Sequence, residues 1–66
     1  MEIIVNGETR QLAQQLSVAQ LLAEIGMPAQ RLAVEVNRAI VPRSAYDAHY
    51  LKHGDQVELV CAVGGG

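Results

Sequence analysis

The chain has 66 residues, a formal net charge of −2 and 50% hydrophobic residues, which is enough apolar material for one small core. A domain of this size buries only about 60% of the surface that its unfolded chain exposes, so we expect modest stability. The acidic balance gives no general attraction to nucleic acid. A single cysteine, Cys61, excludes an internal disulfide bond and a cysteine-only zinc site. No apolar run approaches the ~20 residues of a membrane span, and we expect a soluble, cytoplasmic protein.

The chain opens with a predicted β-hairpin. Residues 1–5 are a short apolar run rich in β-branched side chains, and Asn6-Gly7 follows it. Asn-Gly is the favoured centre of a type I′ turn because both residues tolerate a positive φ. Residues 8–13 should therefore be the returning strand, and their polar character places that strand at a sheet edge.

A helix over residues 18–25 is the clearest predicted element. Ser17 and Gln20 have the spacing of a capping box, in which each side chain accepts a hydrogen bond from the other residue's backbone. Apolar residues then recur at helical spacing, at Val18, Leu21, Leu22 and Ile25. Gly26 supplies a C-terminal cap, and Pro28 prevents the helix from continuing.

Three further strands are predicted after the helix. Residues 32–37 alternate between apolar and less apolar side chains, as a half-buried strand does, and residues 40–41 are a second short apolar pair that Pro42 ends. Residues 44–51 predict a loop or a short helical turn, and residues 54–55 predict a tight turn. Residues 56–63 alternate again and are apolar on both faces near their end, so this last strand should be central in the sheet.

The resulting order β-β-α-β-β-β predicts an α+β fold of the β-grasp, or ubiquitin-like, type. Its mixed sheet of four to five strands would carry one main helix on one face, with the first and last strands parallel neighbours at the centre. Residues 1–63 should form a single domain, and residues 64–66 a flexible C-terminal glycine tail.

Strand alternation assigns side chains to the two faces of this sheet. The helix-covered face should hold Ile3, Val5, Leu32, Val34, Val36, Val57, Leu59 and Cys61. The opposite face should hold Ile4, Ala33, Glu35, Glu58, Val60 and Ala62. We expect Ile4 and Val60 to lie close together and, with Ala62, to form an apolar patch where a partner docks. The alternative is that the 44–51 segment covers Ile4 and Val60.

Candidates for catalysis within the domain are weak. His49 and His53 have the i, i+4 spacing of a metal pair, but no third ligand of a known motif lies nearby. Cys61 alternates with core positions, where cysteine usually acts as a small buried hydrophobe. There is no glycine-rich nucleotide-binding motif. We therefore expect no metal site, no bound cofactor and no enzymatic activity.

The C-terminus is the strongest functional candidate. The predicted central strand runs directly into Gly64, Gly65 and Gly66. Glycine has no Cβ, so three in a row can enter a channel too narrow for other residues. A terminal carboxylate becomes reactive when a partner uses ATP and a divalent cation to convert it into an acyl-adenylate, and a sulfur nucleophile can then form a thiocarboxylate. The alternative is a frayed end without a function.

Four segments carry a resemblance to a known family: residues 1–7 (MEIIVNG), 34–44 (VEVNRAIVPRS), 54–58 (GDQVE) and 63–66 (VGGG). Through them the whole chain resembles the ThiS family, the sulfur carriers of thiamine biosynthesis. The common Gly-Gly ending of that family matches Gly65-Gly66, and Gly64 extends it.

The resemblance implies a reaction cycle. A ThiF-like adenylyltransferase would adenylate the Gly66 carboxylate, a cysteine desulfurase would supply sulfur, and a ThiG-like thiazole synthase with a TIM-barrel fold would accept it. Two alternatives stay open. One is a carrier for another pathway, such as molybdopterin synthesis, and the other is a non-covalent β-grasp binding module, against which the acidic balance speaks.

Overall fold

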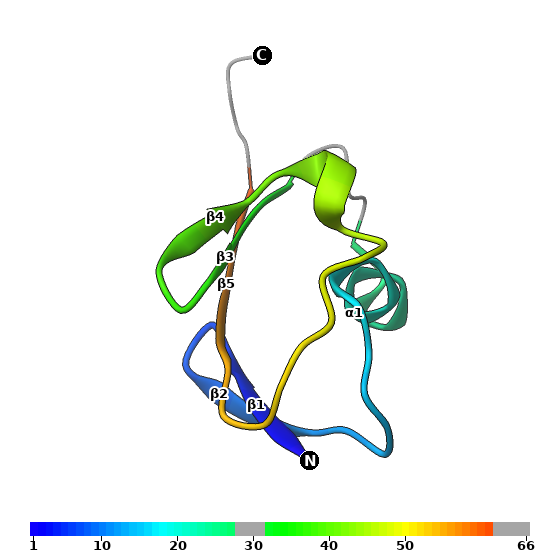
Figure 1. The fold of residues 1–66 in the computed structure, drawn as a ribbon. Coiled ribbons are helices and arrows are strands. Elements are labelled where there is room, and N and C mark those ends of the chain that lie inside the picture. Colours follow the sequence, from blue (N-terminus) through cyan, green and yellow to red (C-terminus); the bar gives the residue numbers. More distant parts are fainter. Residues whose placement is uncertain (28–31, 62–66) are drawn as a thin grey trace.

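In the part of the chain that the structure describes, five strands form one sheet and one α-helix packs across one of its faces (Figure 1). The computed structural model describes residues 1–27 and 32–61. Its elements are β1 (Glu2–Val5), β2 (Glu8–Gln11), α1 (Val18–Ile25), β3 (Leu32–Val36), β4 (Ala39–Val41), a short 3₁₀ helix (Arg43–Ala45) and β5 (Gln56–Cys61). The strands lie in the order β2-β1-β5-β3-β4, which confirms the predicted β-grasp arrangement. No helix in the described ranges has the length and apolar character to cross a membrane.

The β1–β2 hairpin closes through the predicted two-residue turn. Asn6 and Gly7 have φ values of 49° and 83°, so both lie in the left-handed region that a type I′ turn requires. All four residues of β2 are exposed, as expected at a sheet edge. The strand ends at Gln11 rather than residue 13, because Leu12 turns into the core and donates its N–H to the Met1 carbonyl at 2.7 Å.

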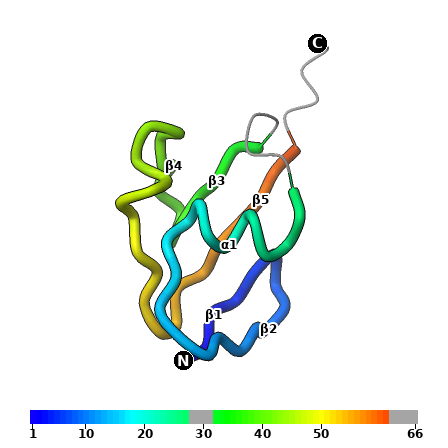
Figure 2. Tube along the Cα trace, turned by 90° about the vertical axis from the view of Figure 1, so that its right-hand side faces the viewer, coloured from blue at the N-terminus to red at the C-terminus, as the bar shows by residue number. Residues whose placement is uncertain are grey.

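The helix has its predicted bounds and caps. Gln20 N–H donates to Ser17 Oγ at 3.2 Å, and Ser17 N–H donates to Gln20 Oε1 at 2.9 Å, so the capping box is complete. Gly26, with a φ of 84°, ends α1 in the left-handed conformation and donates its N–H to the Leu22 carbonyl. α1 lies across one face of the sheet (Figure 2). Its apolar stripe is buried at Val18, Leu21 and Leu22. Pro28 lies outside the described residues.

β5 is the central strand, as predicted. It runs parallel to β1, where Val5 lies beside Val57, and antiparallel to β3, where Val34 lies beside Leu59. The last two residues of the predicted strand, 62 and 63, lie outside the described residues, as does the predicted 64–66 tail.

The segment between β4 and β5 packs on the helix side of the sheet (Figure 1). Tyr46 and Leu51 are buried in the core, Tyr46 donates its hydroxyl to the Leu32 carbonyl at 3.3 Å, and Leu51 N–H donates to the Leu16 carbonyl at 2.8 Å. The alternative in which residues 44–51 cover the opposite face is therefore wrong for Val60, which is 52% exposed.

The core confirms most of the predicted helix-covered face. Buried there are Ile3, Leu32, Val34, Val36, Val57 and Leu59, and Val5 is half-buried. Cys61 is exposed, so its predicted burial is wrong. The physical reason is its place at the end of β5. β1 ends at Val5, which lies beside Val57, so β1 does not extend to Cys61 four residues later.

Candidate functional site

The part of the candidate site that the structure describes is the strand leading to the C-terminal glycines. Ala62 and Gly64 to Gly66, the predicted tail and its flank, lie outside the described residues. β5 is held by β3 along its whole paired length, from Val57 to Cys61. Five residues, 62–66, follow Cys61 in the sequence, and a fully extended chain of that length spans at most about 18 Å. The end of β5 is therefore the point from which the predicted functional tail begins.

Asn6 holds β5 on the side where β1 is too short to do so. The Asn6 Oδ1 accepts a hydrogen bond from Leu59 N–H at 2.8 Å, and its Nδ2 donates to the Leu59 carbonyl at 3.4 Å. In a parallel pair the two backbone groups of one residue bond to two residues of the neighbouring strand, and here the Asn6 side chain takes the place of both. It extends the support of β5 by two residues beyond Val57, toward the tail.

Asn37 holds the beginning of the same strand. Its Oδ1 accepts from Gln56 N–H at 3.0 Å, its backbone N–H donates to the Gln56 carbonyl at 2.8 Å, and its Nδ2 donates to Asp55 Oδ1 at 2.9 Å. Asn37 and Arg38 form the β3–β4 turn with φ values of 52° and 70°. The sequence analysis did not predict that either asparagine side chain would bond to β5. It treated Asn6 only as a turn residue. Both asparagines directly follow a strand and have a positive φ. An asparagine directly after a predicted strand is therefore the sequence signal that could have indicated this role.

The face opposite α1, called here the open face, includes Ile4, Ala33, Glu35, Ile40, Gln56, Glu58 and Val60. Across β3 and β5, Ala33 lies beside Val60 and Glu35 beside Glu58. Across β3 and β4, Ile40 lies beside Glu35. Val60 and Ile40 are 52% and 73% exposed, so this face presents apolar side chains around a pair of carboxylates.

Ile4 and Val60 share the open face but are not neighbours, so their predicted closeness is wrong. Ile4 lies beside Gln56, four residues before Val60. At 3.3 Å per residue this separates them by about 13 Å, with Glu58 between them. Alternation gives the face of each residue but not the register of the two strands. The apolar neighbour of Val60 is Ala33, and the docking role of Ile4, Val60 and Ala62 stays a prediction.

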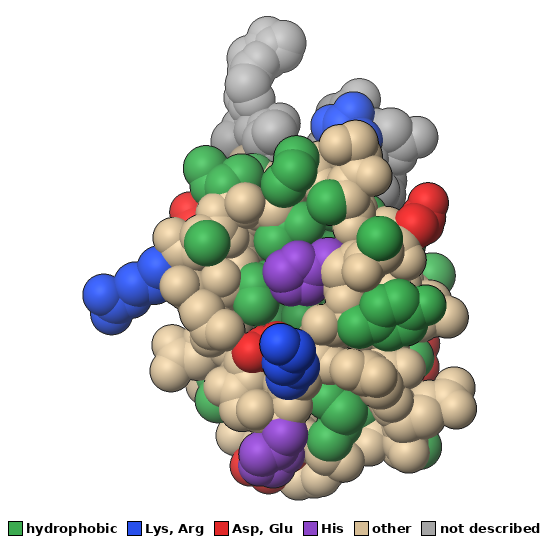
Figure 3. Space-filling model, in the orientation of Figure 1, with side chains coloured by type: hydrophobic (Ala, Val, Ile, Leu, Met, Phe, Trp, Pro, Cys, Tyr) green, Lys and Arg blue, Asp and Glu red, His purple; other side chains and the backbone are tan. Residues whose placement is uncertain are grey.

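The two histidines have separate surroundings. His53 Nδ1 accepts a hydrogen bond from Glu2 N–H at 3.1 Å, which uses the lone pair that a metal ion would need. Figure 3 shows the histidine side chains at separate places on one face of the molecule, with a basic side chain between them. In residues 1–27 and 32–61, no group of three or more His, Cys, Asp or Glu side chains could hold a metal ion.

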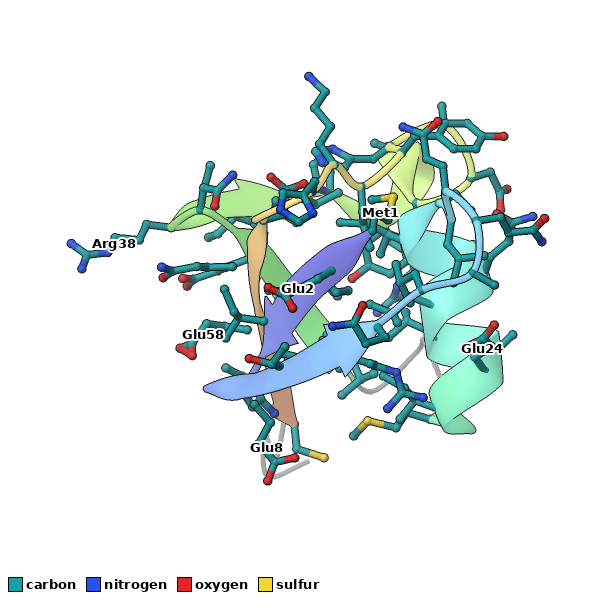
Figure 4. The ribbon with its side chains drawn as sticks, turned by 90° about the horizontal axis from the view of Figure 1, so that it is seen from below. Met1, Glu2, Glu8, Glu24, Arg38 and Glu58 are labelled. Carbon is teal, nitrogen blue, oxygen red and sulfur yellow. The ribbon has the colours of Figure 1, made fainter. Side chains whose placement is uncertain are left out.

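Charged side chains project from both layers of the molecule (Figure 4). Glu58 and Arg38 point away from α1, Glu58 from β5 and Arg38 from the β3–β4 turn. Glu24 lies on α1, on the other side of the molecule. The charged side chains of the open face therefore lie on the opposite side of the molecule from Glu24 on α1.

Comparisons with known proteins agree with this geometry. The ThiS family model matches residues 3–66. The sulfur carrier protein ThiS of Escherichia coli is 32% identical over 66 residues, covering 100% of each chain. The crystal structure of the thiamine biosynthesis protein ThiS from Geobacter metallireducens superposes with a TM-score of 0.88 at 36% identity, covering 100% of both chains.

Longer proteins also contain a matching segment. The thiazole synthase of Paramagnetospirillum magneticum is 39% identical to this chain over 66 residues. That match covers 100% of this chain and 20% of the synthase, and a thiazole synthase of Magnetococcus marinus matches in the same proportion at 38% identity. The chain thus spans about a fifth of the length of these relatives.

Proposed function

This chain belongs to the ThiS family of sulfur carrier proteins in thiamine biosynthesis, and we propose that the carboxylate of Gly66 is the group that carries the sulfur. The observation that carries the proposal is the central strand β5, fastened on both sides, which leads into Gly64-Gly65-Gly66. A rigid strand followed by residues without Cβ atoms suits a chain end that enters another protein's active site. The protein is a carrier rather than a catalyst, and enzymes act on its terminus.

The first step would be adenylation by a ThiF-like adenylyltransferase. A carboxylate oxygen of Gly66 attacks the α-phosphorus of ATP, and pyrophosphate leaves. The partner, with a divalent cation, stabilises the negative charge that develops on the phosphates. The product is an acyl-adenylate, whose carbonyl carbon is open to a nucleophile. ATP is a substrate of the partner, and the carrier needs no cofactor of its own. The same proposal places the protein in the cytoplasm, where ATP is available.

The second step would exchange the adenylate for sulfur. The terminal sulfur of a persulfide, derived from a cysteine desulfurase, attacks the acyl carbon, and AMP leaves. Cleavage of the resulting S–S bond by a thiol reductant supplies two electrons and leaves the thiocarboxylate on Gly66. This group is a soft nucleophile that can pass its sulfur to an acceptor.

Thiazole synthase is the acceptor that we propose. Support comes from the two relatives of that name, each of which contains a segment equivalent to this whole chain. A carrier domain within the same chain as its acceptor works at a high effective concentration, which is an advantage only if the two act together. Molybdopterin synthesis is the alternative acceptor pathway, and transfer assays with both acceptors would distinguish them.

Docking would place the terminus in each partner's active site. Val60 is half-exposed and immediately precedes Cys61, the last described residue of β5. Apolar contacts of the partner with Val60, Ala62 and the more distant Ile4 would fix the start of the tail relative to the partner's active site.

The proposed function is tested by intact-mass measurement. The protein is incubated with the adenylyltransferase, ATP, magnesium and a sulfur source, and we expect a mass gain equal to the replacement of one oxygen by sulfur. A chain extended by one alanine after Gly66 is the matched control and should gain no sulfur. An unchanged mass in the presence of an adenylyltransferase that is active on another carrier would contradict the proposal.

A further inference from the structure

Two glutamates face each other at the centre of the open face. Glu35 on β3 and Glu58 on β5 are directly opposed in the antiparallel register. Residues in this relation have Cβ atoms about 5 Å apart, and like charges so placed destabilise the strand pair. Within the part of the chain that the structure describes, neither carboxylate has a hydrogen bond or an ion pair. The isolated protein therefore keeps a repulsive pair in its sheet.

Apolar side chains flank this pair. Ile40, 73% exposed, lies beside Glu35, and Val60, 52% exposed, is the next residue of β5 on the same face as Glu58. α1 and the segment between β4 and β5 pack on the other side of the sheet, so neither covers these residues. Apolar side chains with a charge between them match a partner surface that has one cation surrounded by apolar groups.

We propose that the Glu35–Glu58 pair receives a basic side chain, an arginine by preference, from thiazole synthase. The inference rests on the proposed function and deepens it. A guanidinium presents five donors in a planar fork and can bond two carboxylates at once, which a lysine ammonium does with less defined geometry. The cation would replace the repulsion between Glu35 and Glu58 with two attractive contacts, so docking gains from both changes.

Two observations favour thiazole synthase as the partner: the position of the pair near the tail, and the names of the longer relatives. Glu58 and Val60 lie on β5, the strand that leads to the tail, so a protein bound to them also faces the end of the chain. The longer relatives that contain a segment equivalent to this chain are named thiazole synthase. A docking contact between the Glu35–Glu58 pair and thiazole synthase would therefore bring the tail close to the enzyme that accepts the sulfur.

Glutamine variants test the proposal because they keep the side-chain volume and remove the charge. We expect Glu35→Gln and Glu58→Gln to fold with an unchanged or raised Tm, because repulsion is relieved. Each should bind thiazole synthase about three- to tenfold more weakly than the wild type and with a weaker dependence on salt. Glu24→Gln on α1 is the matched control, and its Kd should equal that of the wild type.

The outcomes separate this inference from the proposed function. If Glu35→Gln and Glu58→Gln bind the synthase as tightly as Glu24→Gln, the acidic pair has no role, even where the wild type gains sulfur in the mass assay. A wild-type protein that gains sulfur but does not bind the synthase also overturns the inference and leaves the carrier function intact. Lower stability of both variants would contradict the repulsion on which the argument depends.

Discussion

At the scale of single residues, Asn6 has two separate tasks. Its backbone closes the hairpin with a positive φ, and its side chain holds both polar groups of the Leu59 backbone. An alanine would disturb both tasks together, because alanine strains at positive φ. Glycine adopts that φ freely and removes only the side chain.

We therefore expect Asn6→Gly to lower the free energy of unfolding by about 1–2 kcal/mol, because Leu59 loses its partners. Amide hydrogen exchange at Leu59 should become faster. Asn6→Asp is the matched control, since its Oδ1 still accepts the Leu59 N–H and should keep that amide protected. Equal exchange at Leu59 in wild type and Asn6→Gly would show that the Asn6 side chain does not hold β5.

Cys61 and the pair Ile4 and Val60 show where reasoning from the sequence stops. Alternation placed Cys61 on the helix-covered face, but its exposure depends on where β1 ends along β5. Likewise, alternation placed Ile4 and Val60 on one face, but their separation depends on the parallel register, which no local pattern encodes. Period-two patterns determine a face, whereas the distance between two strands' residues is a property of the assembled sheet.

At the scale of elements, the sequence was most informative for motifs whose hydrogen bonds join residues close together in the sequence. The Asn6-Gly7 turn, the Ser17 and Gln20 capping box and the Gly26 cap each involve groups within a few residues, and all were predicted correctly. The central place of β5 also followed from its composition. The tertiary hydrogen bonds of Asn6 and Asn37, which join distant segments, left only a weak local signal.

The capping box gives a prediction for α1. Ser17→Ala removes the acceptor of the Gln20 N–H in a buried position, so the unfolding free energy should fall by about 1 kcal/mol. For a domain of this size the Tm should fall by about 4–8 °C per kcal/mol, measurable by circular dichroism. Ser44→Ala, at an exposed position, is the control and should leave Tm unchanged. A Ser17→Ala variant as stable as the wild type would show that water replaces the cap.

At the scale of the whole molecule, the two faces of the sheet differ. α1 and the segment between β4 and β5 bury one face, whereas the open face exposes Ile40 and Val60, and we propose that a partner binds there. Val60→Asp should leave the protein folded, because Val60 is 52% exposed, and should weaken binding by about 1–2 kcal/mol through loss of an apolar anchor. Ala23→Asp on the exposed side of α1 is the control. Titrations that give unchanged affinities for both adenylyltransferase and thiazole synthase would exclude Val60 from docking.

The proposed reaction at Gly66 predicts that a change in the tail affects adenylation but not the stability of the fold. Gly65→Val adds a β-branched side chain next to Gly66, and a narrow channel in the adenylyltransferase should reject it. Since misplacement by about 1 Å can cost 100-fold in rate, we expect adenylation to fall by about that factor. Stability should stay within about 0.5 kcal/mol of the wild type, because the substitution lies beyond β5. Deleting Gly66 is a weaker test, since the shortened chain still ends in Gly-Gly.

Gly65→Ala separates the size of the channel from a need for backbone freedom. A methyl group adds little volume, so a channel limited by size should give Gly65→Ala a rate between those of the wild type and Gly65→Val. Equal losses for Ala and Val would instead indicate that residue 65 adopts a backbone conformation open only to glycine when it is bound. Pyrophosphate release measures the adenylation rate, and unfolding curves measured on the same samples establish that the loss occurs at the terminus. Wild-type rates for Gly65→Val would refute the channel, because a valine would then pass wherever the glycine does.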